Sequence, residues 1–371
     1  MILRNTKVEH TDRKTGLVLK KTTTSEGEFF NHKIAVNNVL FRCEQQRINE
    51  KPLLNNPFQI NHIRYINKKL RWDFESIQSS RYHASIQKRF YLAFQQRNMK
   101  QWKSLTFPEA EVDFQTLASI GLTFVPYPIP LDTSLEEWIP RRENTMSLLH
   151  KNQILVPMFC SKHQRDLFEE IFNYEFENSK LIGIQCYSLN DADTLANLIK
   201  IKLRNMMLQT GDEAPLLIGL NYSKVQKYFS CVSGSFAYAC YGFDILSERQ
   251  IWLENMPKEI REEILKTRPE EIMKYDRVLG GFNLSAEQEF YDGKNLTEEF
   301  LNTVKVTEKL TEYQAIQWAN HKGQQEDFNI LNNHILETAY EEDSALNYIE
   351  LEKERWSVFW KTNMPRMGGI I

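Results

Sequence analysis

The chain has 371 residues, of which 42% are apolar and 26% are charged, so it is long enough to bury a large core. Its 46 basic and 49 acidic side chains give a net charge of −3, which excludes a wholesale coating of nucleic acid but allows a local basic patch. The five cysteines show no paired spacing, the N-terminus lacks an apolar signal segment, and no apolar run approaches membrane-spanning length. We therefore expect a cytoplasmic protein with reduced thiols and no membrane partner.

The N-terminal part of the chain is polar and only weakly patterned. Residues 1–35 centre on "KKTTTSEGE" and predict a frayed arm or short hairpins, and "AVNNVLFRC" (35–43) contains a strand. Residues 60–104 are rich in Arg, Lys, Gln and aromatic side chains, and 79–103 has helical spacing with basic residues on its polar side. This pattern favours a solvated helix face over a surface that tracks phosphates.

Helices and short apolar strands alternate from about residue 108. The segments expected as helices are 108–121, 133–151, 162–178, 190–211 and 222–232. The segments expected as strands are 122–128, 154–160, 181–188, 215–220 and 235–243. Strands that are apolar at nearly every residue are typical of a parallel sheet covered by helices. Because no G-x-G-x-x-G follows an early strand, we expect an irregular (β/α)8 TIM-like barrel rather than a dinucleotide-binding fold.

The predicted organisation is one barrel followed by a helical extension. The barrel and its polar N-terminal arm are expected to occupy residues 1–296, with the earliest strands drawn from residues 30–105. "RVLGGFN" (277–283) predicts the last short strand of the barrel. Helical sequence continues from 297 onward, so residues 297–371 are predicted to form a helical C-terminal region.

One acidic residue, Asp244, directly follows the apolar run "SFAYACYGF" (235–243). In (β/α)8 barrels the catalytic side chains lie at the carboxyl ends of the strands and in the loops that follow them. A half-buried carboxylate in that position can act as a nucleophile or as a base. An aspartate there can equally cap the helix that follows. The residues alone leave both roles of Asp244 open.

The same rule selects further residues at the predicted strand ends. They are Pro126 to Asp132, Phe159, Cys160, Gln185, Cys186, Tyr187 and Asn221. Cys160 and His163 form a C-x-x-H, and with Cys186 they could hold zinc, or a Cys–His pair could act as a nucleophile. There is no C-x-x-C, and Cys is often a small core residue, so we favour core packing and expect no metal.

Two stretches and an arginine pair carry a family resemblance. "LTFPEAEVDFQTLASIGLTFVPYP" (105–128) runs from an LTPE-like helix, which carries a Gln, into a short strand and a loop with an aspartate. The next helix carries Arg141 and Arg142, and "YGFDILSER" (241–249) contains an "FD" after an apolar run. In this order, over residues 70–250, these features resemble the tRNA-guanine transglycosylase superfamily, and the resemblance implies that Arg141 and Arg142 contact phosphates. Members of that family are irregular (β/α)8 barrels that exchange a purine-like base in nucleic acid.

The resemblance implies roles for individual side chains. Asp244 falls on the family's glycosyl nucleophile, and Arg249 lies near an arginine that contacts nucleic acid. "WDFESIQSS" (72–80) resembles the family's D-S-G-G-F-Q loop, because Asp73 and Gln78 keep its D-x4-Q spacing although both glycines are absent. Asp73 would then act as acid and base on the incoming base.

The resemblance also selects a set of base-contacting residues. The expected substrate-binding residues are Gln78, Asp132, Phe159, Gln185, Tyr187 and Gly219. Phe159-Cys160 stands where the family has a "QG", and Gln185-Cys186 stands where it has paired glycines. The family's zinc motif, C-x-C-x-x-C with a later His, does not occur in this sequence.

By resemblance, we expect a base-exchange transglycosylase, a pentosyltransferase that inserts a 7-deazapurine-type base into DNA or tRNA through an aspartyl glycosyl-enzyme intermediate. One alternative is a catalytically inactive barrel that acts as an interaction or nucleic-acid-binding subunit, and another is a different barrel enzyme that acts on a small molecule, so whether the chain is an enzyme stays open. Nucleic acid and a purine-like base are the expected partners, with no cofactor, and a homodimer or a partner subunit is left open. The enzyme hypothesis predicts that Asp244 and Asp73 face one cavity at the carboxyl ends of the strands.

Overall fold

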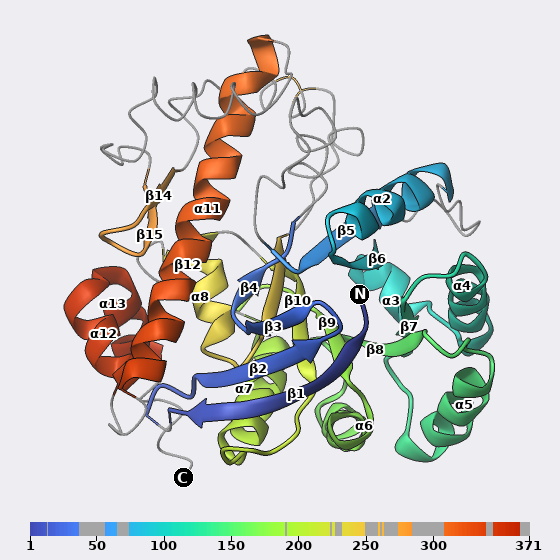
Figure 1. Ribbon diagram of the computed structural model, residues 1–371. Helices are drawn as coiled ribbons and strands as arrows, with labels where there is room; N and C mark the ends of the chain where they lie inside the picture. Colours follow the sequence, from blue (N-terminus) through green and yellow to red (C-terminus); the bar gives the residue numbers. More distant parts are fainter. Residues whose placement is uncertain are drawn as a thin grey trace.

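The computed structural model describes residues 1–12, 14–36, 56–64, 74–189, 191–222, 225–226, 232–248, 259, 262, 274–283, 308–338 and 344–363. Within them, parallel strands at the centre are flanked by helices, an antiparallel N-terminal sheet lies across one end, and helices close the chain (Figure 1). The molecule is therefore an α/β protein, as its alternating pattern predicts. None of the helices in these ranges is both long and apolar enough to cross a membrane.

Eight of the described strands run parallel, in two hydrogen-bonded groups. The larger group has the order β4 (Lys33–Ile34), β13 (Ile245–Glu248), β10 (Leu216–Tyr222), β9 (Leu181–Gln185), β8 (Ile154–Cys160) and β7 (Phe124–Pro128). The smaller group pairs β5 (Phe58–Arg64) with β6 (Phe90–Gln96). A parallel bridge between Val36 and Gln59 joins the two groups, because Val36 follows β4 and Gln59 lies in β5.

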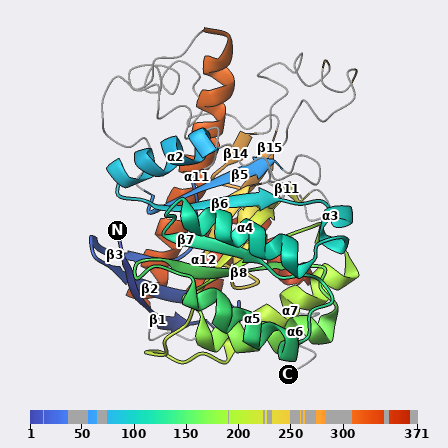
Figure 2. The same cartoon turned by 90° about the vertical axis from the view of Figure 1, so that its right-hand side faces the viewer.

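A seam without ladder hydrogen bonds separates β6 from β7, although the two strands lie side by side (Figure 2). The N–H of Ile129 donates to the carbonyl oxygen of Met158 in β8. Successive N–H groups of a strand point to opposite sides, so the positions of Pro126 and Pro128 face β6. Proline has no N–H to donate, and the sequence "FVPYP" therefore removes two ladder donors at this edge.

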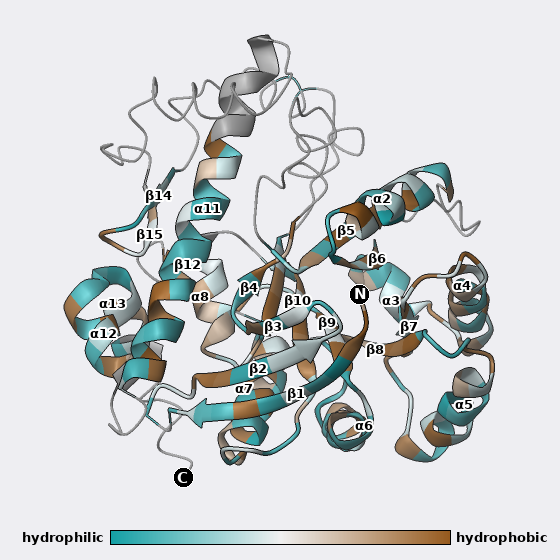
Figure 3. Ribbon diagram, in the orientation of Figure 1, coloured by the Kyte–Doolittle hydropathy of each residue, from teal (hydrophilic) through white to brown (hydrophobic). Residues whose placement is uncertain are grey.

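Alternate residues of the parallel strands face two different cores. The outer core lies between strands and helices, and the inner core contains strand residues and no residue of a described helix. The buried members of the inner core are Leu3, Ala35, Phe58, Ile60, Phe90, Leu92, Phe94, Phe124, Val156, Met158, Leu181, Leu216, Ile218, Leu220 and Ile245. All eight parallel strands contribute, counting Ala35 with β4, and most of these side chains stabilise the fold by roughly 1.5–3 kcal/mol each. The central strands are correspondingly hydrophobic (Figure 3).

Helices follow the strands as the periodicity predicts. They are α2 (Phe74–Ile86), α3 (Met99–Lys103), α4 (Phe107–Ser119), α5 (Leu135–Ser147), α6 (Arg165–Asn178) and α7 (Ala192–Met206). Capping boxes begin α4 at Thr106 and Glu109 and α5 at Ser134 and Glu137, and the Asp191 side chain caps α7. The continuous helix expected over 79–103 is wrong in its centre, which β6 (Phe90–Gln96) occupies, whereas α2 and α3 lie at its two ends.

The predicted helix 222–232 and strand 235–243 are also wrong. β10 continues to Tyr222, and two short strands follow, β11 (Val225–Gln226) and β12 (Val232–Ser233). The next element is a helix, α8 (Gly234–Ala239), capped by the Ser233 side chain. Every residue of α8 is buried, so this helix has no polar face and its sequence reads like a buried strand.

The N-terminal residues form the short hairpins that their composition allows. They build an antiparallel sheet of β1 (Leu3–Thr11), β2 (Val18–Thr24) and β3 (Gly27–Phe30). Leu3 is buried in the inner core, and Phe29 packs edge-on against Phe58 of β5 with ring centroids 5.6 Å apart. The N-terminal sheet therefore covers one end of the parallel strands.

The described part of the C-terminal region contains the helices α11 (Glu308–Glu337), α12 (Ser344–Glu352) and α13 (Glu354–Asn363). It shares the outer core, since Trp356 stacks on Phe236 of α8 with ring centroids 4.2 Å apart. The stretch 277–283 was expected as the last barrel strand. It contains β15 (Gly281–Asn283), which pairs with β14 (Lys274–Asp276) in a small antiparallel sheet, so β13 is the last parallel strand along the described chain.

Candidate functional site

Asp244 lies at the amino end of the parallel strands, not at the carboxyl end. It directly precedes β13, and its N–H donates to the carbonyl oxygen of Leu217, near the start of β10, at 2.9 Å. Its position follows from the helix that replaces the expected strand 235–243. The expectation that Asp244 ends a strand at the catalytic edge of a barrel is therefore wrong.

The Asp244 carboxylate is engaged in a buried structural cluster. Its Oδ2 accepts from the Lys20 ammonium at 2.7 Å and from the Leu217 N–H at 2.7 Å, and its Oδ1 accepts from the Asn31 amide at 2.7 Å. Lys20 and Asp244 are 0% and 1% exposed, so the pair is shielded from solvent. Lys20 belongs to β2 and Asn31 follows β3, so this carboxylate binds the N-terminal sheet to the parallel strands.

Neutral polar side chains occupy the opposite end of the strands. His62 of β5, Gln96 of β6, Gln185 of β9 and Ser247 of β13 continue the alternation of the inner core toward the carboxyl ends. The His62 Nε2 lies 2.8 Å from the Ser247 Oγ, and the His62 Nδ1 lies 3.1 Å from the Gln96 Oε1. Burial lowers the pKa of His62 to about 4, so this imidazole is neutral near pH 7.

Gln185 and Tyr187 hold the segment that follows β6. The Gln185 Oε1 accepts from the Arg97 N–H at 3.1 Å and from the Trp102 indole at 3.1 Å, and its amide donates to the Arg97 carbonyl oxygen. The Tyr187 hydroxyl also donates to that carbonyl oxygen, at 2.9 Å. Both predicted substrate-binding residues lie at the expected strand end, and these contacts tie the end of β9 to the turn after β6.

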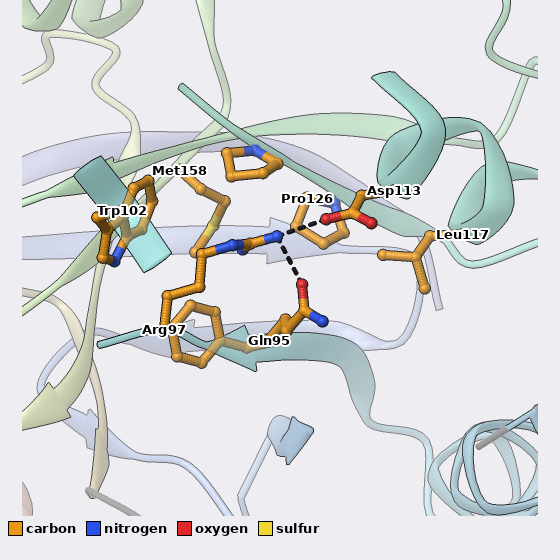
Figure 4. Close-up of a pocket in the computed structure, with 9 residues that line it drawn as sticks. Gln95, Arg97, Trp102, Asp113, Leu117, Pro126 and Met158 are labelled. Carbon is orange, nitrogen blue, oxygen red and sulfur yellow. Dashed lines mark hydrogen bonds and ion pairs between the residues drawn. The ribbon is translucent and has the colours of Figure 1, made fainter. Parts of the chain in front are cut away.

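A narrow pocket opens at the seam between β6 and β7 (Figure 4). The volume of this pocket is about 270 Å³, including its solvent-open entrance. The Arg97 guanidinium forms a buried ion pair with Asp113 of α4 and donates to the Gln95 Oε1 at 2.5 Å, and the Trp102 ring lies 5.6 Å from the guanidinium carbon. These polar side chains occupy the space beside the two prolines that interrupt the ladder.

Two predicted base-contacting residues face the outer core instead of the inner one. Phe159 is fully buried and packs against His163 and against Phe168 of α6 at centroid distances of 5.7 and 5.4 Å. A Cβ on Gly219 would meet the side chains of Leu246 and Phe243. The strand alternation explains both corrections, because each residue lies one position away from an inward-facing one.

The remaining predicted site residues lie elsewhere. Gln78 is exposed on α2, and Asp132 is exposed in the turn after β7. Asp73 and Arg249 lie outside the described residues, so the structure places neither of them. The prediction that Asp244 and Asp73 share a cavity fails on the position of Asp244.

The arginine pair joins neighbouring helices. Arg141 of α5 binds Glu111 of α4 at 2.9 Å, and its guanidinium carbon lies 3.9 Å from the centre of the Phe107 ring. Arg142 binds the fully buried Glu175 of α6 at 2.8 Å. Both side chains therefore have structural partners between helices.

Cys160, His163 and Cys186 are core residues, as favoured from the sequence. The His163 Nδ1 lies 2.8 Å from the Cys160 carbonyl oxygen, and burial lowers its pKa. Burial also raises the pKa of Cys160 to about 12 and raises that of Cys186, so neither thiol is activated. No group of three His, Cys, Asp or Glu side chains that could hold a metal occurs within the described ranges.

The sequence analysis did not select Ser247 and His62. Alternate residues of a strand face the same side, so Ser247 faces the inner core because Ile245 does. Predicting this from the sequence requires a strand that begins after Asp244. His62 faces the inner core for the same reason, two residues after Ile60 and four after Phe58. For Ser247, recognising α8 as a helix was the missing step, and for His62 it was recognising β5 as a strand.

The chain matches no protein-family model and no curated protein sequence. The resemblance to the tRNA-guanine transglycosylases therefore rests on its motifs and on the order of its elements.

Proposed function

We propose that the chain is a (β/α)8-type barrel that recognises a purine-like base of nucleic acid at the carboxyl ends of its strands and performs no glycosyl transfer at Asp244. The observation that carries the proposal is the distribution of charge between the two ends. The only carboxylate predicted as nucleophile is buried against Lys20 at the amino end, whereas neutral side chains continue the inner core at the carboxyl end.

The inner core supports the closed barrel. Residues of eight parallel strands meet in one cluster that contains no residue of a described helix. One face of an open sheet would need helices or a second sheet to cover it, whereas a barrel covers its inner face with its own strands. In this proposal the barrel closes at the seam, and the contact between β6 and β7 without a ladder supports it.

The neutral layer at the carboxyl ends supports recognition of an uncharged ring. The carboxamide of Gln96, the imidazole of His62 and the hydroxyl of Ser247 are of types that donate and accept hydrogen bonds without a charge. The edges of a purine-like base present the complementary pattern, and the resemblance to transglycosylases supports this substrate class. Attack on a sugar carbon, by contrast, is best served by a carboxylate.

Binding and covalent trapping test the proposal together. Labelled tRNA and labelled DNA are titrated with the protein, free 7-deazaguanine is added as competitor, and a denaturing gel detects adducts. We expect binding that the free base weakens, and no adduct at Asp244. Gln96→Ala should weaken competition by the base, whereas Gln78→Ala, which changes an exposed side chain of α2, should not. Equal competition in both variants, or an adduct mapped to Asp244, contradicts the proposal.

Base exchange through another carboxylate is the second candidate. Glu248 is the last residue of β13 and is half-buried. The pKa of Tyr222 is raised mainly by burial and secondly by the negative charge of Glu248. A carboxylate at this strand end has the position that Asp244 lacks. An adduct on the denaturing gel that disappears in Glu248→Gln, but persists in Asp132→Asn, would favour exchange over recognition alone.

A further inference from the structure

The carboxyl end also contains a serine, a histidine and a glutamine in a continuous hydrogen-bonded chain. The Ser247 Oγ lies 2.8 Å from the His62 Nε2, and the His62 Nδ1 lies 3.1 Å from the Gln96 Oε1. The three side chains come from β13, β5 and β6, so they meet only in the folded protein. A nucleophile, a base and a group that orients the base are related in this way in nucleophilic catalysis.

We infer that Ser247 is a nucleophile activated by His62, that Gln96 is the positioning residue for His62, and that the substrate is an uncharged ester. This activity goes beyond the recognition of a base and does not depend on it.

The tautomer of His62 follows from its neighbour. A carboxamide oxygen can only accept, so contact with the Gln96 Oε1 requires the proton of the neutral ring to lie on Nδ1. The Nε2 lone pair then faces the Ser247 hydroxyl and can accept its proton. Burial keeps the ring in this neutral form near pH 7, because it lowers the pKa of His62 to about 4, against the smaller opposite effect of Gln96.

The reaction balances with water as the second substrate. The Ser247 Oγ attacks the ester carbonyl carbon while its proton moves to the His62 Nε2. The tetrahedral intermediate expels the alcohol, which takes that proton, and leaves an acyl-serine. Water then attacks the acyl carbon, gives a proton to the His62 Nε2, and releases the carboxylic acid as the proton returns to Ser247.

The charge of the surroundings selects the electrophile. The side chains that continue the inner core at this end are uncharged, and His62 lies edge-on to Phe94 with ring centroids 5.3 Å apart. A phosphodiester would require cations to stabilise its charge, whereas a neutral ester requires none to bind. Ser247 and His62 are buried, so the test uses small uncharged reagents.

Two small reagents test the inference on the full-length protein. Phenylmethylsulfonyl fluoride should sulfonylate the Ser247 Oγ with loss of fluoride, and peptide mapping by mass spectrometry locates the adduct in the unaltered chain. p-Nitrophenyl acetate should be hydrolysed, and Ser247→Ala should abolish both reactions. His62→Gln should slow both by at least about 100-fold, the usual contribution of a general base. Ser235→Ala is the control, because this buried serine is bonded to Gln324 and not to a histidine.

The pH profile separates positioning by Gln96 from a purely structural role. Gln96→Glu places a carboxylate beside the His62 Nδ1, which should move the acid limb of hydrolysis to higher pH, whereas Gln96→Leu should lower the rate. An unlabelled Ser247 in the folded, unaltered protein overturns the inference. Equal labelling of His62→Gln and the unaltered protein overturns it too.

Discussion

Replacing Lys20 with Met removes the cation that balances Asp244 at the amino end of the parallel strands. The Asp244 carboxylate would keep its hydrogen bonds from Asn31 and from the Leu217 N–H, both 2.7 Å long, but would remain as a buried charge without a counterion. Removal of one partner of a buried ion pair typically destabilises a protein by about 3–5 kcal/mol. The Lys20 ammonium also donates to the Pro215 carbonyl oxygen at 2.9 Å, which places the expected loss in the upper part of that range.

Urea unfolding followed by far-UV circular dichroism measures this loss. The adjacent Lys21 supplies a matched control, because it pairs with Glu28 at 2.6 Å while the two side chains are 34% and 50% exposed, and Lys21→Met should change the unfolding midpoint little. The double variant Lys20→Met with Asp244→Asn should lose less stability than the sum of the single variants, since no bare charge remains buried. If Lys20→Met unfolds at the same urea concentration as Lys21→Met, the structural role assigned to Asp244 is wrong.

Three further predictions concern the fold and its pH dependence. Gly242→Ala should destabilise the protein by more than about 1 kcal/mol, since the φ of Gly242 is 92°, in the left-handed region, and a Cβ would collide with an asparagine of α7. Gly211 has a φ of 93° but open space around it, so Gly211→Ala should lower the free energy of unfolding by less. Urea unfolding midpoints would show the difference. Arg142→Met should lose about 3 kcal/mol because its partner is buried, and Arg141→Met under about 1 kcal/mol, with nucleic-acid binding unchanged in both. The pKa of His62 is lowered to about 4 in the folded protein, so as pH falls from about 6.5 the unfolded chain binds a proton before the folded one does. The free energy of unfolding should therefore drop by roughly 3 kcal/mol by about pH 4. His62→Gln should reduce that drop, as unfolding measurements at about pH 7 and about pH 4.5 would show.

The alternating pattern was sufficient for the helices and strands from α4 to β10, because strands buried on both faces and amphipathic helices have different periods. It was insufficient at α8, which is buried on all sides and has no polar face to mark its period. That single misassignment moved Asp244 from one end of the sheet to the other. The same step concealed Ser247, whose inward direction depends on where β13 begins.

The sequence by itself determined the α/β class, the parallel strands and the helices of the described C-terminal residues. These properties depend on residues close together along the chain. Only the tertiary structure decided that Asp244 is the counterion of Lys20, 224 residues away, and that Ser247 lies against His62, 185 residues away. A buried carboxylate and a reactive one have the same local sequence signature. What distinguishes them is which distant side chains the fold brings within hydrogen-bonding distance.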